Sequence, residues 1–229
     1  MSIDPNSKYR QVAMVDSAGR VAVHTGELCI PEAGHVAGEG FSVQANLMRS
    51  AEVWPAMAEA FESSGGPLKA RLLAALEAAE AVGGDIRGRQ SAAILVVSSQ
   101  PTGRPWRDVV VDLRVEDHPS PVEELKRLLR LHEAYEHSNR GDELLSKGEV
   151  EGALREYEEA TRLAPEVVEL PFWQAVTLAG IGRLAEAAPI FKRLFDRDKT
   201  WIEVLRRLPK AEIISEAVVV EILDELGLS

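Results

Sequence analysis

A 34-residue recurrence in the second half of the chain is the sequence feature that most restricts its fold. Leu144 recurs as Leu178, and Pro165 closes the first copy. The other equivalent pairs are Gly148 and Gly182, Ala153 and Ala187, Tyr157 and Phe191, and Ala160 and Leu194. This period is typical of helix-pair repeats, which bind other chains. The second half is therefore predicted to be helical and to serve in binding.

The composition describes a globular protein without a basic surface. Of the 229 residues, 45% are hydrophobic and 28% are charged, as in soluble globular chains. The net charge is −11, with 11 basic and 15 acidic residues in 1–118 and 15 basic and 22 acidic residues in 119–229. Because phosphate backbones are bound by clustered Lys and Arg, nucleic acid is not an expected partner.

Cysteine usage and hydropathy indicate the compartment. Cys29 is the single cysteine, which excludes an internal disulfide and a Cys-based zinc cluster. No stretch approaches the ~18 apolar residues of a membrane span, and the start of the chain lacks the apolar region of a signal peptide. We expect a cytoplasmic protein that does not bind a membrane.

The first half alternates short apolar runs with two helical stretches. Strands are predicted at Gln11–Asp16, Arg20–Thr25, Phe41–Met48, Ser91–Ser98 and Val109–Val115, and helices at Glu52–Glu62 and from Pro67 to Gly83. The first two strands are expected to form a hairpin, and 26–40 a loop or strands broken by tight turns. The continuous apolar run in 91–98 predicts a strand covered on both faces, whereas alternation in 109–115 predicts one polar face. This order favours an α+β fold with helices on one face of a largely antiparallel sheet.

A proline-rich segment, Asp117–Pro121, is the predicted boundary between two domains, residues 1–118 and 119–229. Pro121 is suited to open the next helix, whose apolar stripe ends at Tyr135. Beyond it, helices are predicted at Ser138–Lys147, Val150–Leu163, Phe172–Gly180, Leu184–Arg197, Trp201–Leu208 and Ala211–Leu226.

The recurring positions resemble the tetratricopeptide family over about residues 134–201. In that family, glycines like Gly148 and Gly182 lie in the turn between helices, where the missing Cβ is expected to let the helices approach closely. Lys199 departs from the family pattern, because it stands where a second closing proline belongs. Two copies need neighbours to bury their faces, so the flanking helices or the first domain are expected to cap them. An ordinary helical bundle with a chance period is the alternative.

The first half contains a series of short blocks that carry a second resemblance. They include His24-Thr25-Gly26-Glu27, Val43-Gln44-Ala45-Asn46-Leu47-Met48, Arg87-Gly88-Arg89-Gln90-Ser91 and Val111-Asp112-Leu113-Arg114-Val115. Together they resemble a bacterial domain family of unknown function with an N-terminal-nucleophile (Ntn) hydrolase-like fold, over about residues 9–118. The resemblance implies an αββα sandwich in which the first residue of the mature chain attacks an amide carbonyl and its own amine is the base.

The start of the chain departs from this family. Family members have a further front segment that supplies the first strands and the nucleophile, whereas this chain starts just before Arg10. Ser2 would be the first residue after removal of Met1, but a turn-like leader follows it, and we do not assign it as the nucleophile. The expected fold is therefore an incomplete αββα sandwich, from either a misplaced start or a true remnant. Its open sheet edges would favour a homodimer.

Six polar residues of the first half are candidate site residues. The candidates for catalysis are His35, Asn46 and Arg89, and the candidates for binding are Gln44, Gln90 and Ser91. His35 suits a ligand contact or a bond to a nearby carbonyl, and Asn46 an oxyanion donor or a helix cap. Arg89 suits a carboxylate or phosphate clamp, although an ion pair with Asp85 or Asp112 is the favoured interpretation.

Other motifs predict no metal and no cofactor. Cys29 has no basic neighbour and is expected to be an inert core residue. Asp117 and His118 lack further ligands at metal-binding spacing. The glycine-rich segment 83–88 precedes a strand, whereas a phosphate-binding loop precedes a helix.

Two functions of different class follow. The first is a non-catalytic or catalytically incomplete Ntn-like protein that dimerises through its sheet domain and binds a protein or peptide on its helices. The alternative is an Ntn-type amide hydrolase whose nucleophile lies in a segment upstream of this chain.

Overall fold

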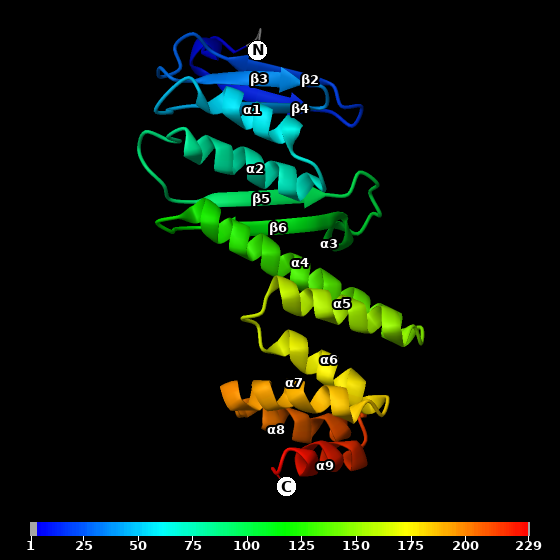
Figure 1. Cartoon of the computed structure of the whole chain (residues 1–229). Coiled ribbons are helices and arrows are strands. Elements are labelled where there is room, and N and C mark those ends of the chain that lie inside the picture. The colour runs from blue at the N-terminus through cyan, green and yellow to red at the C-terminus, as the bar shows by residue number, and fades with distance from the viewer. Residues whose placement is uncertain (1–3, 229) are drawn as a thin grey trace. The chain divides into compact units, whose positions relative to one another are not determined.

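The computed structural model describes residues 4–228 and contains two compact units, residues 1–128 and 129–229 (Figure 1). We call them the N-terminal and the C-terminal unit. The division falls after Leu128, inside a helix, and not at the proline-rich segment. Within the described residues, no helix combines the length and apolar character that crossing a membrane requires.

The N-terminal unit is an α+β structure, as predicted. Its strands are β1 (Gln11–Val15), β2 (Val21–Thr25), β3 (Gly34–Gly38), β4 (Phe41–Ala45), β5 (Ala92–Val97) and β6 (Val109–Val115). Its helical elements are the short η1 (Ser7–Tyr9), α1 (Val53–Ser63), α2 (Leu68–Ala81) and the four-residue α3 (Pro105–Asp108). The strands form three antiparallel pairs, β1–β2, β3–β4 and β5–β6.

The predicted first hairpin is confirmed. Gln11 pairs with Thr25 and Val15 with Val21. The Asp16 carboxylate accepts the backbone N–H groups of Ala18 and Arg20 at 3.0 and 2.9 Å, which closes the turn. The segment 26–40, expected to be a loop or broken strands, contains β3, which pairs with β4.

The helices are sandwiched between strand pairs. Helix α1 packs on β3–β4, α2 packs on α1, and β5 lies on the other side of α2 (Figure 1). Phe61 of α1 links two of these layers, since its ring lies 4.8 Å from that of Phe41 and under the Arg71 guanidinium at 3.9 Å. The expected arrangement, with helices on one face of one sheet, differs from the three two-stranded sheets found here.

Strand β5 is covered on one face only, so the expectation of two covered faces is wrong. Ile94 is 2% exposed, but Leu95 and Val97 are 56% and 58% exposed. Helix α2 and strand β6 pack on β5, and the side chains on its second face stay exposed. In β6 the predicted alternation is confirmed, because Val111 and Val115 are buried while the intervening Asp112 and Arg114 are not.

The C-terminal unit is helical. Its elements are the end of α4 (Pro121–Ser146), α5 (Val150–Leu163), α6 (Glu169–Gly180), α7 (Leu184–Arg197), α8 (Thr200–Arg207), η2 (Leu208–Ala211) and α9 (Glu216–Glu225). The predicted break between Tyr135 and Ser138 is wrong, since α4 runs through it without interruption. No Pro or Gly lies at this point, and Ala134 and Ser138, one turn apart, are both buried.

The two equivalent glycines end their helices in the same way. Gly148 and Gly182 have φ of +78° and +82°. The N–H of Glu149 bonds to Leu144 O at 2.9 Å, and that of Arg183 to Leu178 O at 2.8 Å, which is the Schellman pattern. A Cβ at either glycine would have no atom within 4 Å. The glycines are therefore required by the left-handed backbone and not, as expected, by close approach of the helices.

Close approach occurs instead at Gly141 in α4. A Cβ there would lie 2.5 Å from the ring of Tyr157, which is 1% exposed. The alanines and aromatics of the recurrence are buried as well. With residues of α8 and α9, the main core contains Ala153, Tyr157, Ala187 and Phe191, whereas Ala160 belongs to a second cluster. Phe172 lies at the centre of the main core, with its ring 4.7 Å from Trp201 and 5.9 Å from Phe191.

Replacement of Gly182 tests the role of the left-handed turn. We expect Gly182→Ala to lower the free energy of unfolding by about 1 kcal/mol, because a residue with a Cβ is sterically strained at positive φ. Gly180→Ala is the matched control, since Gly180 lies in helical conformation with equally open space around its Cα. Gly180→Ala should raise the free energy of unfolding by up to about 1 kcal/mol, because alanine has the higher helix propensity. Urea unfolding of both variants measures this, and equal effects would contradict the assignment.

Candidate functional site

An open groove of about 900 Å³ in the N-terminal unit brings together five of the six residues that the sequence singled out. Gln44, Asn46, Arg89, Gln90 and Ser91 all line it. They come from the end of β4 and from the segment that leads into β5. We call this the front groove. Ser2 lies outside the described residues.

Arg89 is held in an ion pair, as favoured, but with a different partner. Its Nε lies 3.3 Å from Glu80 of α2. The expected partners are occupied, since Asp85 binds Arg87 at 2.6 Å and Asp112 binds Arg114 at 2.8 Å. The hydrogen bonds from Arg87 lower the pKa of the Asp85 carboxyl. The charged residues that line the front groove are balanced, with Arg49, Arg87 and Arg89 against Glu80, Asp85 and Asp117.

His35 does not join the front groove. Its Nδ1 lies 2.7 Å from the Thr25 hydroxyl, whereas a backbone carbonyl was the expected partner. It lines a separate cavity that also contains Cys29 and Trp54. Cys29 is half-buried, with its Sγ 3.6 Å from Arg10 O, and so is not the core residue expected.

Asn46 does not cap the helix that follows it. The N-cap residue of α1 is Glu52, whose side chain makes no capping hydrogen bond, and the Glu52 N–H donates to the Ser50 hydroxyl at 3.4 Å. Asn46 is left as an amide on the wall of the front groove. The described residues that line this groove include no His, Lys or Cys, so the side chains there that can act as a base near neutral pH are carboxylates.

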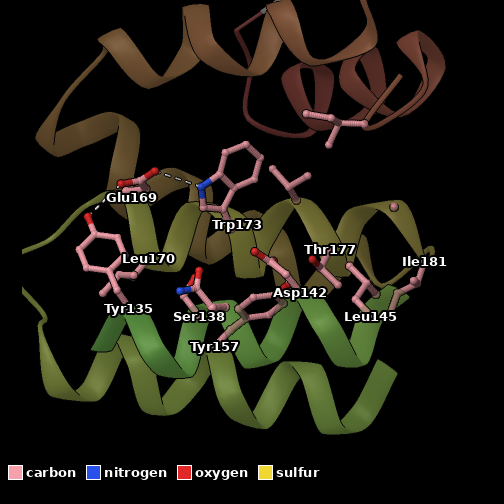
Figure 2. Close-up of a pocket in the computed structure, with 14 residues that line it drawn as sticks. Tyr135, Ser138, Asp142, Leu145, Tyr157, Glu169, Leu170, Trp173, Thr177 and Ile181 are labelled. Atoms are coloured by element: carbon pink, nitrogen blue, oxygen red, sulfur yellow. Dashed lines mark hydrogen bonds between the residues drawn. The ribbon is translucent and has the colours of Figure 1, made fainter. Parts of the chain in front are cut away.

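A second groove, of about 560 Å³, lies in the C-terminal unit between α4 and α6 (Figure 2). We call it the α4–α6 groove. Figure 2 shows the side chains of Tyr135, Asp142 and Leu145 on α4 facing those of Trp173 and Thr177 on α6. The contributors recur every three or four residues on each helix, as in Tyr135, Ser138, Asp142 and Leu145 on α4, which is the spacing of one helical face.

The carboxylates of this groove are fixed by neutral donors. Tyr135 donates its hydroxyl to Glu169 Oε2 at 3.0 Å, and Trp173 Nε1 donates to Glu169 Oε1 at 3.4 Å. Tyr157 donates its hydroxyl to Asp142 Oδ1 at 2.6 Å. Burial and then the bond to Asp142 raise the pKa of Tyr157, and burial and then Glu169 raise that of Tyr135. Both tyrosines are therefore neutral donors at physiological pH.

The sequence predicted a binding surface on the helices but assigned none of these residues to it, since Tyr135 was named only as the end of an apolar stripe and Tyr157 only as a recurring position. The 34-residue recurrence does relate some of these positions, because Tyr135 and Glu169 are 34 residues apart, as are Asn139 and Trp173. All four line the groove. Extending the recurrence from its core positions to its polar ones would have identified them.

Comparison with known proteins yields one family. Residues 1–125 match a family of unknown function, DUF1028. The crystal structure of a protein from Silicibacter pomeroyi in the same family is similar, with 34% identity and a TM-score of 0.48. The similarity covers 56% of this chain and 53% of that protein, so the chain spans about half of this relative's length. No curated protein matches the chain. Because the match extends over more than half of its residues, the chain belongs to the DUF1028 family of unknown function.

Proposed function

We propose that this chain is a non-catalytic interaction protein whose tetratricopeptide-like C-terminal unit binds a peptide segment in the α4–α6 groove. The observation that carries this proposal is the coincidence of groove and register. The equivalent positions Tyr135 and Glu169 line one cavity, and so do Asn139 and Trp173. Helix-pair repeats present such recurring surfaces to extended segments of a partner.

The composition of the α4–α6 groove supports the same proposal. The walls of the groove are partly apolar, with side chains from Leu145, Val176 and Ile181. Trp173 adds an aromatic surface, and a few polar groups lie among these side chains. An apolar cavity of some hundreds of Å³ with a few fixed polar groups is typical of ligand sites. Trp173 is half-buried, so its ring remains accessible to a ligand.

We further propose that the N-terminal unit is an Ntn-like domain that forms a homodimer. Within the described part of the unit, each strand pairs on one side only. Met14 and Val15 on β1 are exposed, as is Leu95 on β5. Strand edges without a partner, together with exposed apolar side chains, favour association with another chain. In a two-fold symmetric dimer, the same strand edges of the second copy would form the other half of the interface.

Amide hydrolysis is the second candidate function. The front groove favours it, because Asn46, Arg89 and Ser91 line one open site. The balanced ion pairs and the absence of a histidine or lysine base from its described lining favour the non-catalytic role. Amide turnover by this chain, lost in Asn46→Ala, would favour the hydrolase.

Blocking the α4–α6 groove tests peptide binding. Asn139 is exposed on the groove wall, so Asn139→Trp adds bulk there without entering the core. Peptides selected from a displayed library against the wild-type chain should bind this variant at least about tenfold more weakly, since they lose contact area. Glu158→Trp, at an exposed position of α5 outside the groove, is the control and should leave affinity unchanged. Equal affinity for all three proteins would place the binding surface elsewhere.

Light scattering after size exclusion tests the dimer. We expect the wild-type chain to elute with the mass of two copies, and Leu95→Lys to shift it to one copy because a charge on an edge strand opposes pairing. Ala18→Lys, which adds the same charge at an exposed turn, should stay dimeric. A monomeric wild type at micromolar concentration would rule out this part of the proposal.

A further inference from the structure

We propose that the α4–α6 groove selects a cationic segment, with an arginine or lysine side chain of the bound peptide beside Glu169 and Asp142. This inference rests on the proposed peptide-binding function and deepens it. It names the chemical class of the partner, which the register alone does not give.

The charges that line the groove have one sign. Asp142 and Glu169 are its acidic residues, and the described residues that line it include no Lys, Arg or His. The two carboxylates come from different helices, so a side chain that enters the groove meets one on each wall (Figure 2).

Among residues 4–228, no Lys or Arg forms an ion pair with either groove carboxylate. Their hydrogen bonds come from the neutral side chains Tyr135, Trp173 and Tyr157. In contrast, carboxylates elsewhere on this unit pair with arginine at 2.7 to 3.3 Å, as in Glu151 with Arg183 and Glu166 with Arg130. Neutral donors orient a carboxylate without cancelling its charge, so the groove keeps its full negative charge for a ligand.

Two further features of the lining fit a guanidinium or ammonium group. The Trp173 indole lies beside the Glu169 carboxylate, to which its N–H donates, and an aromatic face next to a carboxylate favours a cation, arginine above all. Ser138, itself 8% exposed, also lines the groove and adds a hydroxyl oxygen that can accept a hydrogen bond from such a group.

An acidic segment fits this groove poorly. It would bring like charges together in a partly buried site, which costs binding free energy and sets specificity. The net charge of −11 adds to this preference, because it attracts cationic segments over a longer range at low salt.

Charge-matched peptides and variants test the inference. Three short fluorescein-labelled peptides are compared by fluorescence anisotropy, in which arginine, glutamine or glutamate alternates with leucine. We expect the arginine peptide to bind most tightly. Asp142→Asn and Glu169→Gln should each raise its Kd about fivefold, the upper range for a partly exposed ion pair. Both substitutions keep a hydrogen-bond acceptor for the aromatic donors. Added salt should weaken binding of the arginine peptide to the wild type.

Glu158→Gln is the matched control, because it makes the same change in net charge at an exposed position outside the groove. It should leave the Kd unchanged, and circular dichroism confirms that each variant is folded. If the glutamine or glutamate peptide binds as tightly as the arginine peptide and Asn139→Trp still abolishes binding, the groove binds peptides but the cationic preference is wrong. If none of the three peptides binds the wild-type chain, the proposed function is wrong as well.

Discussion

The contact between Gly141 and Tyr157 is the constraint on which the C-terminal unit depends. The Tyr157 ring lies where a Cβ of residue 141 would be, so α4 and α5 approach each other more closely than side chains usually allow. The same tyrosine is 1% exposed, yet its hydroxyl donates to Asp142 in the α4–α6 groove. One side chain therefore serves both the core and the groove, and the position of a groove carboxylate depends on core packing.

Much of this unit could be predicted because its signals are local. A glycine at positive φ, a buried alanine and a buried ring recur at a fixed spacing, and each has a direct backbone or packing cause. The continuity of α4 could not be predicted in the same way, because the repeat pattern suggested a break where no helix-breaking residue lies. In the N-terminal unit, the hairpin followed from local turn residues. The coverage of β5 depends on how α2 packs against it, and an apolar run in the sequence does not show whether one face or both are covered. The partner of Arg89 lies on the same helix, so a nearby aspartate in the sequence does not identify it.

The two grooves differ in how their charges are arranged, and this difference supports a cationic ligand for the α4–α6 groove. In the front groove, Arg89 and Asp85 are each neutralised by a neighbour. In the α4–α6 groove, Glu169 and Asp142 are oriented by neutral hydrogen-bond donors and keep their charge. A groove whose charges cancel has little electrostatic preference among ligands, whereas two carboxylates without a paired cation attract a cationic ligand. The front groove of this DUF1028 protein nevertheless remains its best candidate for any chemistry.

The most direct test of the account is a two-dimensional ¹H–¹⁵N NMR titration of the whole chain with the arginine peptide. The Trp173 indole N–H is a built-in reporter, because it lies in the α4–α6 groove and is bonded to Glu169 at 3.4 Å. The account predicts that this resonance and the backbone amides of Asn139 and Thr177 shift together and saturate at one Kd. Shifts confined to the N-terminal unit, or an indole resonance that does not move while the peptide binds, would contradict it.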